Sequence, residues 1–125
     1  MNGIKILLDS NIILYLLDGD ETLANFLEQK ELYISIITEM ELLSYKGFTN
    51  EEEIHVRNFL SECRSIGIDN DIKTEVIYLR RKFGNKLPDS IIAATSICMD
   101  IPLITADHDF KKIEKLQLIF YEKIK

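Results

Sequence analysis

The sequence is poor in the residues that hold small secreted domains together and in those that bind structural zinc. Its two cysteines, Cys63 and Cys98, lie far apart and outside any Cys-x-x-Cys motif, so we expect buried, reduced thiols rather than a disulfide. Neither of the two histidines, His55 and His108, has a cysteine or another histidine near it at zinc spacing. A disulfide scaffold and a structural zinc site are therefore not indicated.

Long apolar runs are missing as well. No run approaches the roughly 20 residues that a membrane span requires. Residues 1–8 lack the long apolar core and the cleavage site of a signal peptide. We therefore expect a cytoplasmic protein that does not bind a membrane.

An excess of positive charge is also absent. The chain has 15 Lys and Arg against 21 Asp and Glu, a formal net charge of -6. A protein that only binds nucleic acid usually has a strong basic excess. Acidity is most often a solubility feature, but it also suits a protein that gathers carboxylates around a metal. If four acids form such a site, 17 remain against 15 basic residues, and the rest of the surface is close to neutral.

What the sequence does contain is typical of one globular domain, which we expect to span residues 1–125. The chain is 46% hydrophobic and 29% charged. Short apolar runs alternate with segments of helical periodicity. The predicted strands are residues 4–8, 32–35, 65–68, 102–105 and 118–121. The predicted helices with defined bounds are residues 11–18, 21–29, 38–45, 89–99 and 110–116. A further predicted helix begins at a Thr49–Glu52 capping box and carries Val56, Leu60 and Cys63 on one face. Another has an apolar stripe from Ile72 to Phe83.

Strands that alternate with helices predict parallel pairing. The expected fold class is therefore α/β, a three-layer α/β/α sandwich with a mainly parallel, five-stranded sheet. In such a sheet the ligand crevice lies beyond the carboxyl ends of the strands. Residues at these ends are the first candidates for chemistry.

Four acids lie at or near those ends. Asp9 directly follows the first predicted strand, and Asp107 follows the fourth after Ala106. Glu41 lies one turn into the helix after the second strand, and Asp89 begins the apolar helix before the fourth strand. Carboxylates that converge repel one another, and a divalent cation removes that cost. Hard oxygen ligands favour Mg²⁺ or Mn²⁺.

Each acid also has a purely structural interpretation. Asp9 and Asp107 could cap the segments that follow them. Glu41 could be a solvated helix residue, and Asp89 could complement the dipole of its helix. The set is more specific than its members, because an unpaired charge at the head of an apolar helix such as that of Asp89 is costly.

Four segments carry a resemblance to a known family. Residues 8–12 (LDSNI), 38–43 (TEMELL), 87–94 (LPDSIIAA) and 105–110 (TADHDF) resemble the four motifs of the PIN-domain family, in the family's order. Among its members, the chain is most similar to the VapC-type toxins of toxin–antitoxin pairs. The resemblance extends over essentially the whole chain and agrees with the α/β fold expected above.

The resemblance implies a metal-dependent ribonuclease, with Mg²⁺ or Mn²⁺ as cofactor. By matching position, the catalytic acids would be Asp9, Glu41, Asp89 and Asp107, of which Asp9, Asp89 and Asp107 would bind the metal. Asn11, Thr105 and Asp109 would support them. Water would attack the phosphodiester directly and leave a 5′-phosphate and a 3′-hydroxyl, with Glu41 orienting the water.

An acidic site also needs cations to hold an anionic strand. Arg80, Arg81, Lys82 and Lys86 form the densest basic cluster, just before Asp89, and Lys46 follows Glu41. These five are candidate RNA phosphate contacts. A solvated helix end is an equally good interpretation of the cluster. Tyr15 and Tyr45 could stack on bases, although aromatic residues at helical spacing more often belong to a core.

The resemblance also implies partners. These are an RNA substrate, such as a tRNA, a cognate antitoxin protein and a second copy of the chain in a homodimer. Apolar residues around Ile12, Leu16 and Leu43 could form the dimer surface. An antitoxin could fill the acidic pocket with an arginine that pairs with Asp9 or Asp107, and lay an amphipathic segment in an apolar groove beside it.

Three other functions fit the length and architecture. A receiver domain needs an acidic pair after strand one and a lysine after strand five. Here Asp9 stands alone, although Asp69 could mimic the phosphoacceptor. A haloacid-dehalogenase-type phosphatase needs Asp-x-Asp, and residue 11 is Asn. A non-catalytic PIN-fold module that binds RNA or protein remains the main alternative.

Overall fold

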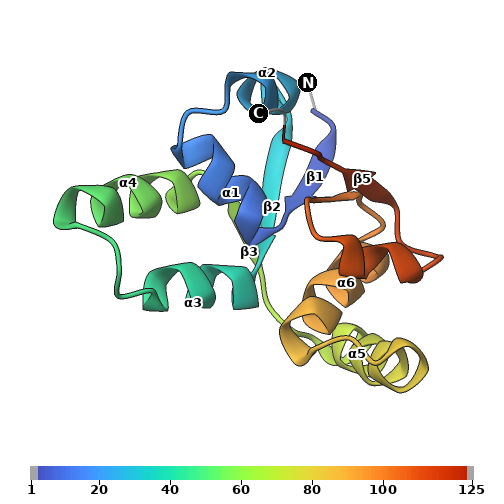
Figure 1. The fold of residues 1–125 in the computed structure, drawn as a ribbon. Coiled ribbons are helices and arrows are strands. Elements are labelled where there is room, and N and C mark those ends of the chain that lie inside the picture. Colours follow the sequence, from blue (N-terminus) through green and yellow to red (C-terminus); the bar gives the residue numbers. More distant parts are fainter. Residues whose placement is uncertain (1–2, 124–125) are drawn as a thin grey trace.

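The computed structural model describes residues 3–123, so the two residues at each end of the predicted domain 1–125 lie outside the described part. Five strands and six α-helices follow one another along the chain (Figure 1). The strands are β1 (Lys5–Leu8), β2 (Glu31–Ser35), β3 (Arg64–Ile66), β4 (Leu103–Thr105) and β5 (Leu118–Phe120). The helices are α1 (Ser10–Leu17), α2 (Glu21–Leu27), α3 (Ile36–Ser44), α4 (Asn50–Ser61), α5 (Asn70–Phe83), α6 (Leu87–Met99) and the 3-10 helix η1 (His108–Lys112).

The strands form one sheet in the order β3-β2-β1-β4-β5, and every neighbouring pair is parallel. The prediction of a parallel, five-stranded α/β sheet is confirmed. The chain runs outward from β1 in one direction to β3 and returns to the other side of β1 for β4. This reversal opens a crevice beyond the carboxyl ends of β1 and β4.

Helices cover both faces of the sheet, which gives the three layers expected. On one face, Leu7 and Leu103 pack with apolar residues of α5 and α6. On the other face, the neighbouring strand residues Ile6 and Ile104 pack with α1, α2 and α4. Successive strand residues point to opposite faces, so the uninterrupted apolar runs of β1 and β4 match a sheet buried on both sides.

Local signals place the helix ends close to where the sequence predicts them. Thr49 and Glu52 form both hydrogen bonds of the predicted capping box at the start of α4. Gly84 ends α5 with a left-handed φ of 73°, a conformation that costs little without a side chain. Pro88 lies in the first turn of α6, where its missing N–H is not needed.

Several predicted details are wrong. β3 ends at Ile66 rather than at residue 68, and the predicted helix at 110–116 is the 3-10 helix η1, which begins earlier because Asp107 caps it. α4 ends at Ser61, so Cys63 follows the helix. Cys63 is half-buried, and burial raises its thiol pKa to about 12. Cys98 is exposed, because the buried part of α6 ends at Ser96.

Ile12 is buried at 0% exposure, so it cannot lie on the dimer surface that the sequence suggested. Leu16 and Leu43 are half-buried and pack against the same core cluster as Ile12. Among residues 3–123, none of the helices combines the length and hydropathy that crossing a bilayer requires.

Candidate functional site

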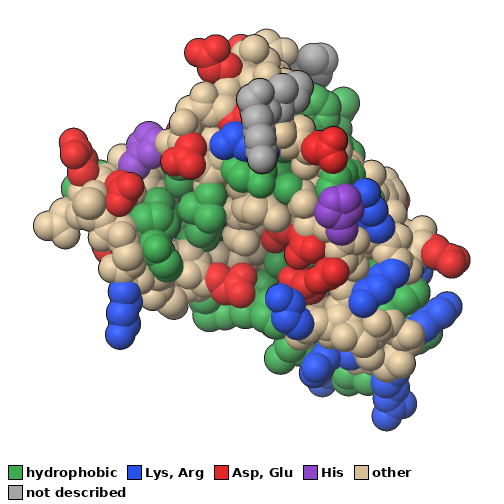
Figure 2. All heavy atoms as spheres, viewed as in Figure 1, with side chains coloured by type: hydrophobic (Ala, Val, Ile, Leu, Met, Phe, Trp, Pro, Cys, Tyr) green, Lys and Arg blue, Asp and Glu red, His purple; other side chains and the backbone are tan. Residues whose placement is uncertain are grey.

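The acids predicted from the sequence converge on one edge of the sheet. Asp9 follows β1 and caps α1, and Asp107 follows β4 and caps η1. Asp89 lies in the first turn of α6, and Glu41 lies on α3. Figure 2 shows Asp and Glu side chains gathered at the centre of this face, between α1, α3 and α6. The sheet topology accounts for this convergence, because β1 and β4 are neighbours whose carboxyl ends meet.

Two of these acids and a third, Asp109, are close enough to share one ion. Asp89, Asp107 and Asp109 each offer one carboxylate oxygen, and these three oxygens lie within 4.8 Å of one another. Oxygens bound to one Mg²⁺ are at most about 4 Å apart, twice the Mg–O distance, so small side-chain rotations would suffice. Within residues 3–123, the Asp89 Oδ2 atom is buried and has no hydrogen-bond partner. An all-carboxylate set with one unsatisfied buried oxygen fits a hard divalent cation.

Asp9 is the most buried acid of the site, at 5% exposure. Its Oδ1 accepts a hydrogen bond from the Ser10 amide (2.8 Å), and its Oδ2 accepts one from the Thr105 hydroxyl (2.6 Å). A carboxylate has about four acceptor positions, so Asp9 retains capacity for a further ligand. Asp9 is therefore fixed in place beside the three clustered acids and can still accept a ligand.

Thr105 connects the first and fourth motifs. Its hydroxyl donates to Asp9 and accepts a hydrogen bond from the Asp107 amide (3.0 Å). Asn11 makes a second link, because its Oδ1 accepts from the Ala106 amide (3.3 Å). Two of the three predicted supporting residues, Asn11 and Thr105, thus hold the β1 and β4 ends in register.

Burial and mutual repulsion raise the carboxyl pKa values of the site. For Asp9 the main cause is burial, which outweighs its two hydrogen bonds, and Asp107 and Glu41 add repulsion. Burial also leads for Asp89, followed by repulsion from Asp107. The pKa of Glu41 is raised by burial and then by Asp89. These mutual effects indicate that the acids form one electrostatic unit, which a cation would stabilise.

The structure groups the acids differently from the sequence-based assignment in one respect. Asp109, expected only to support the site, belongs to the cluster of three oxygens, while Asp9 and Glu41 lie beside that cluster. The Asp109 amide donates to Asp107 Oδ1 (2.9 Å), so a tight turn brings the two acids together. The alternation of acids in Asp107-His108-Asp109 is the signal for this turn in the sequence.

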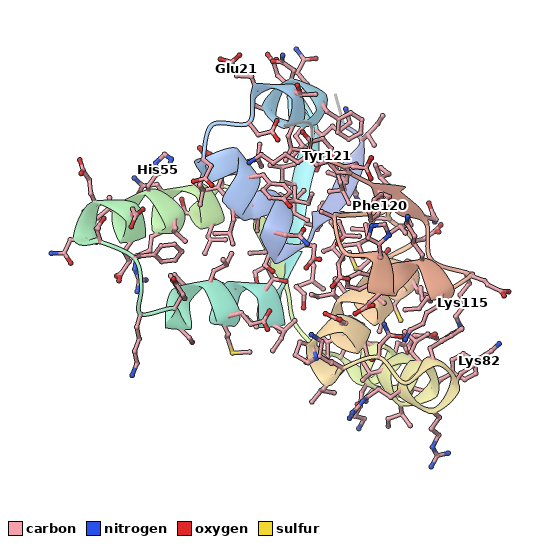
Figure 3. The ribbon with its side chains drawn as sticks, viewed as in Figure 1. Glu21, His55, Lys82, Lys115, Phe120 and Tyr121 are labelled. Atoms are coloured by element: carbon pink, nitrogen blue, oxygen red, sulfur yellow. The ribbon has the colours of Figure 1, made fainter. Side chains whose placement is uncertain are left out.

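The predicted cations differ in their relation to the acids. Lys86 opposes the pKa rise of both Asp89 and Glu41, so its charge acts on the site. Lys82 donates to the Tyr78 hydroxyl instead (3.2 Å), and Figure 3 shows it on α5 at the lower edge of the molecule. Arg80 and Arg81 share the exposed last turn of α5 with Lys82, and Lys46 is exposed after α3.

Asn85 is a site-building residue that the sequence analysis missed. It is 4% exposed, and its Nδ2 donates to the backbone carbonyl of Asp109 (3.2 Å). The backbone carbonyl of Asn85 accepts a hydrogen bond from Ser90 Oγ (3.3 Å). Asn85 therefore ties the α5–α6 loop to η1 and sets the position of Asp109 relative to Asp89. In the sequence, the signal for this role is an asparagine just before a predicted helix, and that signal is not specific.

An apolar groove lies on one side of the acids. It has a volume of about 560 Å³ between α1, α3 and α4, and Leu14, Tyr45 and Phe48 line it. Glu41 belongs to both the groove and the acidic site. Figure 2 shows this hydrophobic area next to the acidic centre. Tyr45, a predicted base-stacking candidate, is 59% exposed and packs edge-on against Phe48 at 4.7 Å between ring centroids.

Comparison with known proteins agrees with the fold. The chain is similar to a chain of a toxin–antitoxin complex from Klebsiella pneumoniae, with 33% identity, 94% of this chain and 99% of that chain covered, and a TM-score of 0.80. A chain of VapBC2 from Rickettsia felis, bound to a DNA fragment from their promoter, has the same fold at 23% identity, with 95% and 100% covered and a TM-score of 0.84. No curated protein matches the chain. Residues 6–116 match the PIN domain.

Proposed function

The chain belongs to the PIN-domain family, and from this premise we propose that it is a Mg²⁺- or Mn²⁺-dependent endoribonuclease. The observation that carries the proposal is the cluster of Asp89, Asp107 and Asp109, with one buried Asp89 oxygen that has no partner among residues 3–123. Such a site binds a cation where a phosphodiester can reach it, since Asp109 is exposed.

Each acid has a distinct part in the proposed reaction. Asp89, Asp107 and Asp109 hold the cation, with Asp9 as a further predicted ligand. A bound divalent cation supplies an activated water and withdraws charge from the phosphate. Glu41, whose pKa is raised, faces the site from α3 and orients the attacking water. Thr105 keeps Asp9 and Asp107 in place.

RNA approaches this acidic centre with help from nearby cations. The Lys86 charge opposes the rise in the carboxyl pKa of Asp89, so Lys86 lies near the site. We propose that it contacts a substrate phosphate. Arg80, Arg81 and Lys82 extend the positive surface along the end of α5, and Lys46 adds a cation after α3. Water attacks the phosphorus directly, so the products carry a 5′-phosphate and a 3′-hydroxyl.

Cleavage of RNA tests the proposal. The purified protein should cut single-stranded and tRNA substrates in Mg²⁺ or Mn²⁺, and EDTA should stop the reaction. Asp107→Asn should lose at least about 100-fold in rate, because a ligand charge is lost. Glu114→Gln, an exposed acid outside the cluster, is the matched control and should retain full rate. A cation-independent activity, or equal rates for wild type and Asp107→Asn, would contradict the proposal. Binding of RNA with no cleavage in either metal would also contradict it, and would make the non-catalytic binding module the better description.

We further propose that the chain is the toxin of a toxin–antitoxin pair, acts in the cytoplasm on an RNA such as a tRNA, and forms a homodimer. The groove beside the acids is suited to an amphipathic antitoxin segment, because Leu14 and Tyr45 are exposed there at 39% and 59%. An antitoxin arginine would pair with Asp9 or Asp107. Of the relatives named above, one is a chain of a toxin–antitoxin complex and the other is a chain of VapBC2 bound to promoter DNA.

Growth assays test the toxin proposal separately. Expression of the wild type alone should arrest a bacterial host, and Asp107→Asn should not. Tyr45→Asp should still arrest growth but escape protection by the proposed antitoxin, since it puts a charge into the apolar groove. Equal growth with soluble wild type and Asp107→Asn would contradict a toxin and leave the nuclease proposal standing. Sedimentation at micromolar concentration tests the dimer.

A further inference from the structure

A second pocket adjoins the acids on the side away from the apolar groove. It has a volume of about 340 Å³, within the range of small-ligand sites, and lies where β4 and β5 end. Ala106 and His108, the two neighbours of Asp107 in the chain, both line it. The backbone of Tyr121, which lines the same pocket, donates to the Thr105 carbonyl (2.8 Å). One segment therefore belongs to both sites, because Ala106 and His108 line this pocket and Asp107 between them belongs to the acidic cluster.

Aromatic rings form the walls of this pocket. Tyr15 and Tyr121 lie 6.2 Å apart between ring centroids, tilted by 53°. His108 and Phe120 form a second pair at 4.6 Å. Figure 3 labels Phe120 and Tyr121 at the end of β5, with Tyr121 directed toward α1. All four rings are at least partly accessible.

The orientation of the Tyr121 ring is fixed from outside the pocket. Its hydroxyl donates to Asp20 Oδ2 (2.7 Å), and Asp20 also caps α2. The phenol is thus held by a bond that uses only the edge of the ring. A ring whose orientation is set in this way can stack on a planar ligand with little loss of side-chain entropy.

Lysines lie over the same rings. Lys123 Nζ is 4.7 Å from the centre of the Tyr15 ring, and Lys111 Nζ is 3.8 Å from that of Phe120. Alternation of aromatic faces with cations is the pattern by which proteins hold single-stranded nucleic acid, with bases on the rings and phosphates on the cations. Among the described residues that line the pocket, Glu122 is the one acid. The groove on the other side has three acids, Asp18, Glu41 and Glu52, and no lysine or arginine among its described lining residues.

We propose that this pocket, formed by Tyr15, His108, Phe120, Tyr121 and Lys123, is a base-stacking subsite for single-stranded RNA next to the cleavage site. The inference rests on the proposed ribonuclease function and adds where the substrate is held. The rings take one unpaired base, and Lys123 and Lys111 contact the phosphates that flank it. Stacking accepts any base, so the subsite selects unpaired RNA rather than a sequence.

Binding of short RNA tests the subsite without cleavage. The probe is a fluorescently labelled hexauridylate in Ca²⁺, together with six versions that each lack one base. Loss of one base-stacking contact corresponds to about 5- to 150-fold in affinity. For the wild type, one abasic position should weaken binding by such a factor. Tyr121→Leu should weaken binding of the intact hexamer to a similar extent and no longer respond to that abasic position.

Two variants serve as matched controls. Tyr121→Phe keeps the ring and should retain the abasic response. Phe26→Leu removes an exposed phenylalanine on α2 whose ring also lies beside a lysine, 4.5 Å from its centroid to Lys30 Nζ, and should bind the hexamer as the wild type does. A Phe26→Leu loss equal to that of Tyr121→Leu would overturn the subsite.

Photo-cross-linking keeps the test decisive if Tyr121→Leu does not fold. A hexamer with 5-iodouridine at the sensitive position should cross-link wild-type protein at Tyr15, Phe120 or Tyr121. Cross-links confined to other segments, or no abasic position that affects binding, would overturn the subsite. Normal cleavage with no abasic response leaves the ribonuclease proposal intact and removes the subsite. An abasic response without cleavage in Mg²⁺ supports the subsite and contradicts the ribonuclease proposal.

Discussion

Replacing Asp89 by Asn should stabilise the metal-free protein and, at saturating metal, make it less stable than the wild type. In the metal-free protein, the buried Asp89 Oδ2 has no partner among residues 3–123, and Asp107 and Asp109 offer oxygens within 4.8 Å of an Asp89 oxygen. Burial and repulsion from Asp107 both raise the pKa of Asp89, so its charge is unfavourable there. Asn keeps the shape and removes the charge.

The distance sets the size of the effect. Two like charges 4.8 Å apart repel by about 0.9 kcal/mol in water and about 3.5 kcal/mol at the effective dielectric of a protein surface. Asp107 is half-exposed and Asp109 is exposed, so solvent screens the pair strongly. We expect a gain of about 1 kcal/mol for metal-free Asp89→Asn, or about 3–5 °C in Tm for a domain of this size.

Saturating metal should make the wild type more stable than Asp89→Asn. A ligand that binds only the native state at 100 times its dissociation constant stabilises it by about 2.7 kcal/mol. Asp89→Asn loses one anionic ligand, so it should gain much less from Mn²⁺ than the wild type does. Thermal unfolding in EDTA and across a Mn²⁺ titration should therefore show the two Tm curves crossing. Glu114→Gln should follow the wild type throughout. A variant that is less stable in EDTA and gains as much from Mn²⁺ as the wild type would refute the reasoning.

Three further predictions concern the same site. Asp9 and Asp89 have raised pKa values, so the native state binds more protons than the unfolded chain. The contribution of these two acids to metal-free stability therefore falls as pH rises from about 4 through the raised pKa values. Chemical unfolding across this pH range should show a smaller fall in stability for Asp89→Asn than for the wild type. Thr105→Val should cost about 1–3 kcal/mol in urea unfolding, because Asp9 Oδ2 loses its buried donor, and a cost below that of an exposed Thr→Val change would contradict it. Asn85→Leu should weaken Mn²⁺ binding by about 10-fold in calorimetry, whereas Thr95→Val, a buried hydroxyl that bonds only within α6, should leave Mn²⁺ affinity unchanged.

The sequence contains most of the information about the fold because its helix and strand signals are local. The capping box at Thr49, the stop at Gly84 and Pro88 in the first turn of α6 each act within one helical turn. Parallel pairing follows from the alternation of strands and helices, whereas the strand order β3-β2-β1-β4-β5 was not predicted. The helix predicted at 110–116 is η1 at 108–112, and its bounds were wrong because its start depends on the Asp107 cap rather than on apolar periodicity.

Burial of particular residues was harder to predict. Cys98 continues the apolar pattern of α6 and yet is exposed, because the layer that covers α6 ends at Ser96. Ile12 has the same chemistry as a surface contact residue and is nonetheless fully buried. The exposure of each residue depends on where neighbouring elements end. Tertiary packing sets those ends, and local sequence does not predict them.

The candidate site shows the same division. Asp9, Asp89 and Asp107 could be predicted because each occupies a defined place at a strand or helix end. Membership of Asp109 in the cluster depends on a two-residue turn and on the Asn85 side chain, which reaches it from 24 residues away. Only the folded structure brings that pair together.

The location of Mn²⁺ in crystals of the protein tests the central claim most directly. Anomalous scattering from crystals grown with Mn²⁺ should give a peak in direct contact with carboxylate oxygens of Asp89, Asp107 and Asp109. The same measurement on Asp107→Asn crystals should show a much weaker peak. A strong wild-type peak elsewhere, or no peak at these acids at millimolar Mn²⁺, would contradict a metal-dependent nuclease site at this edge of the sheet.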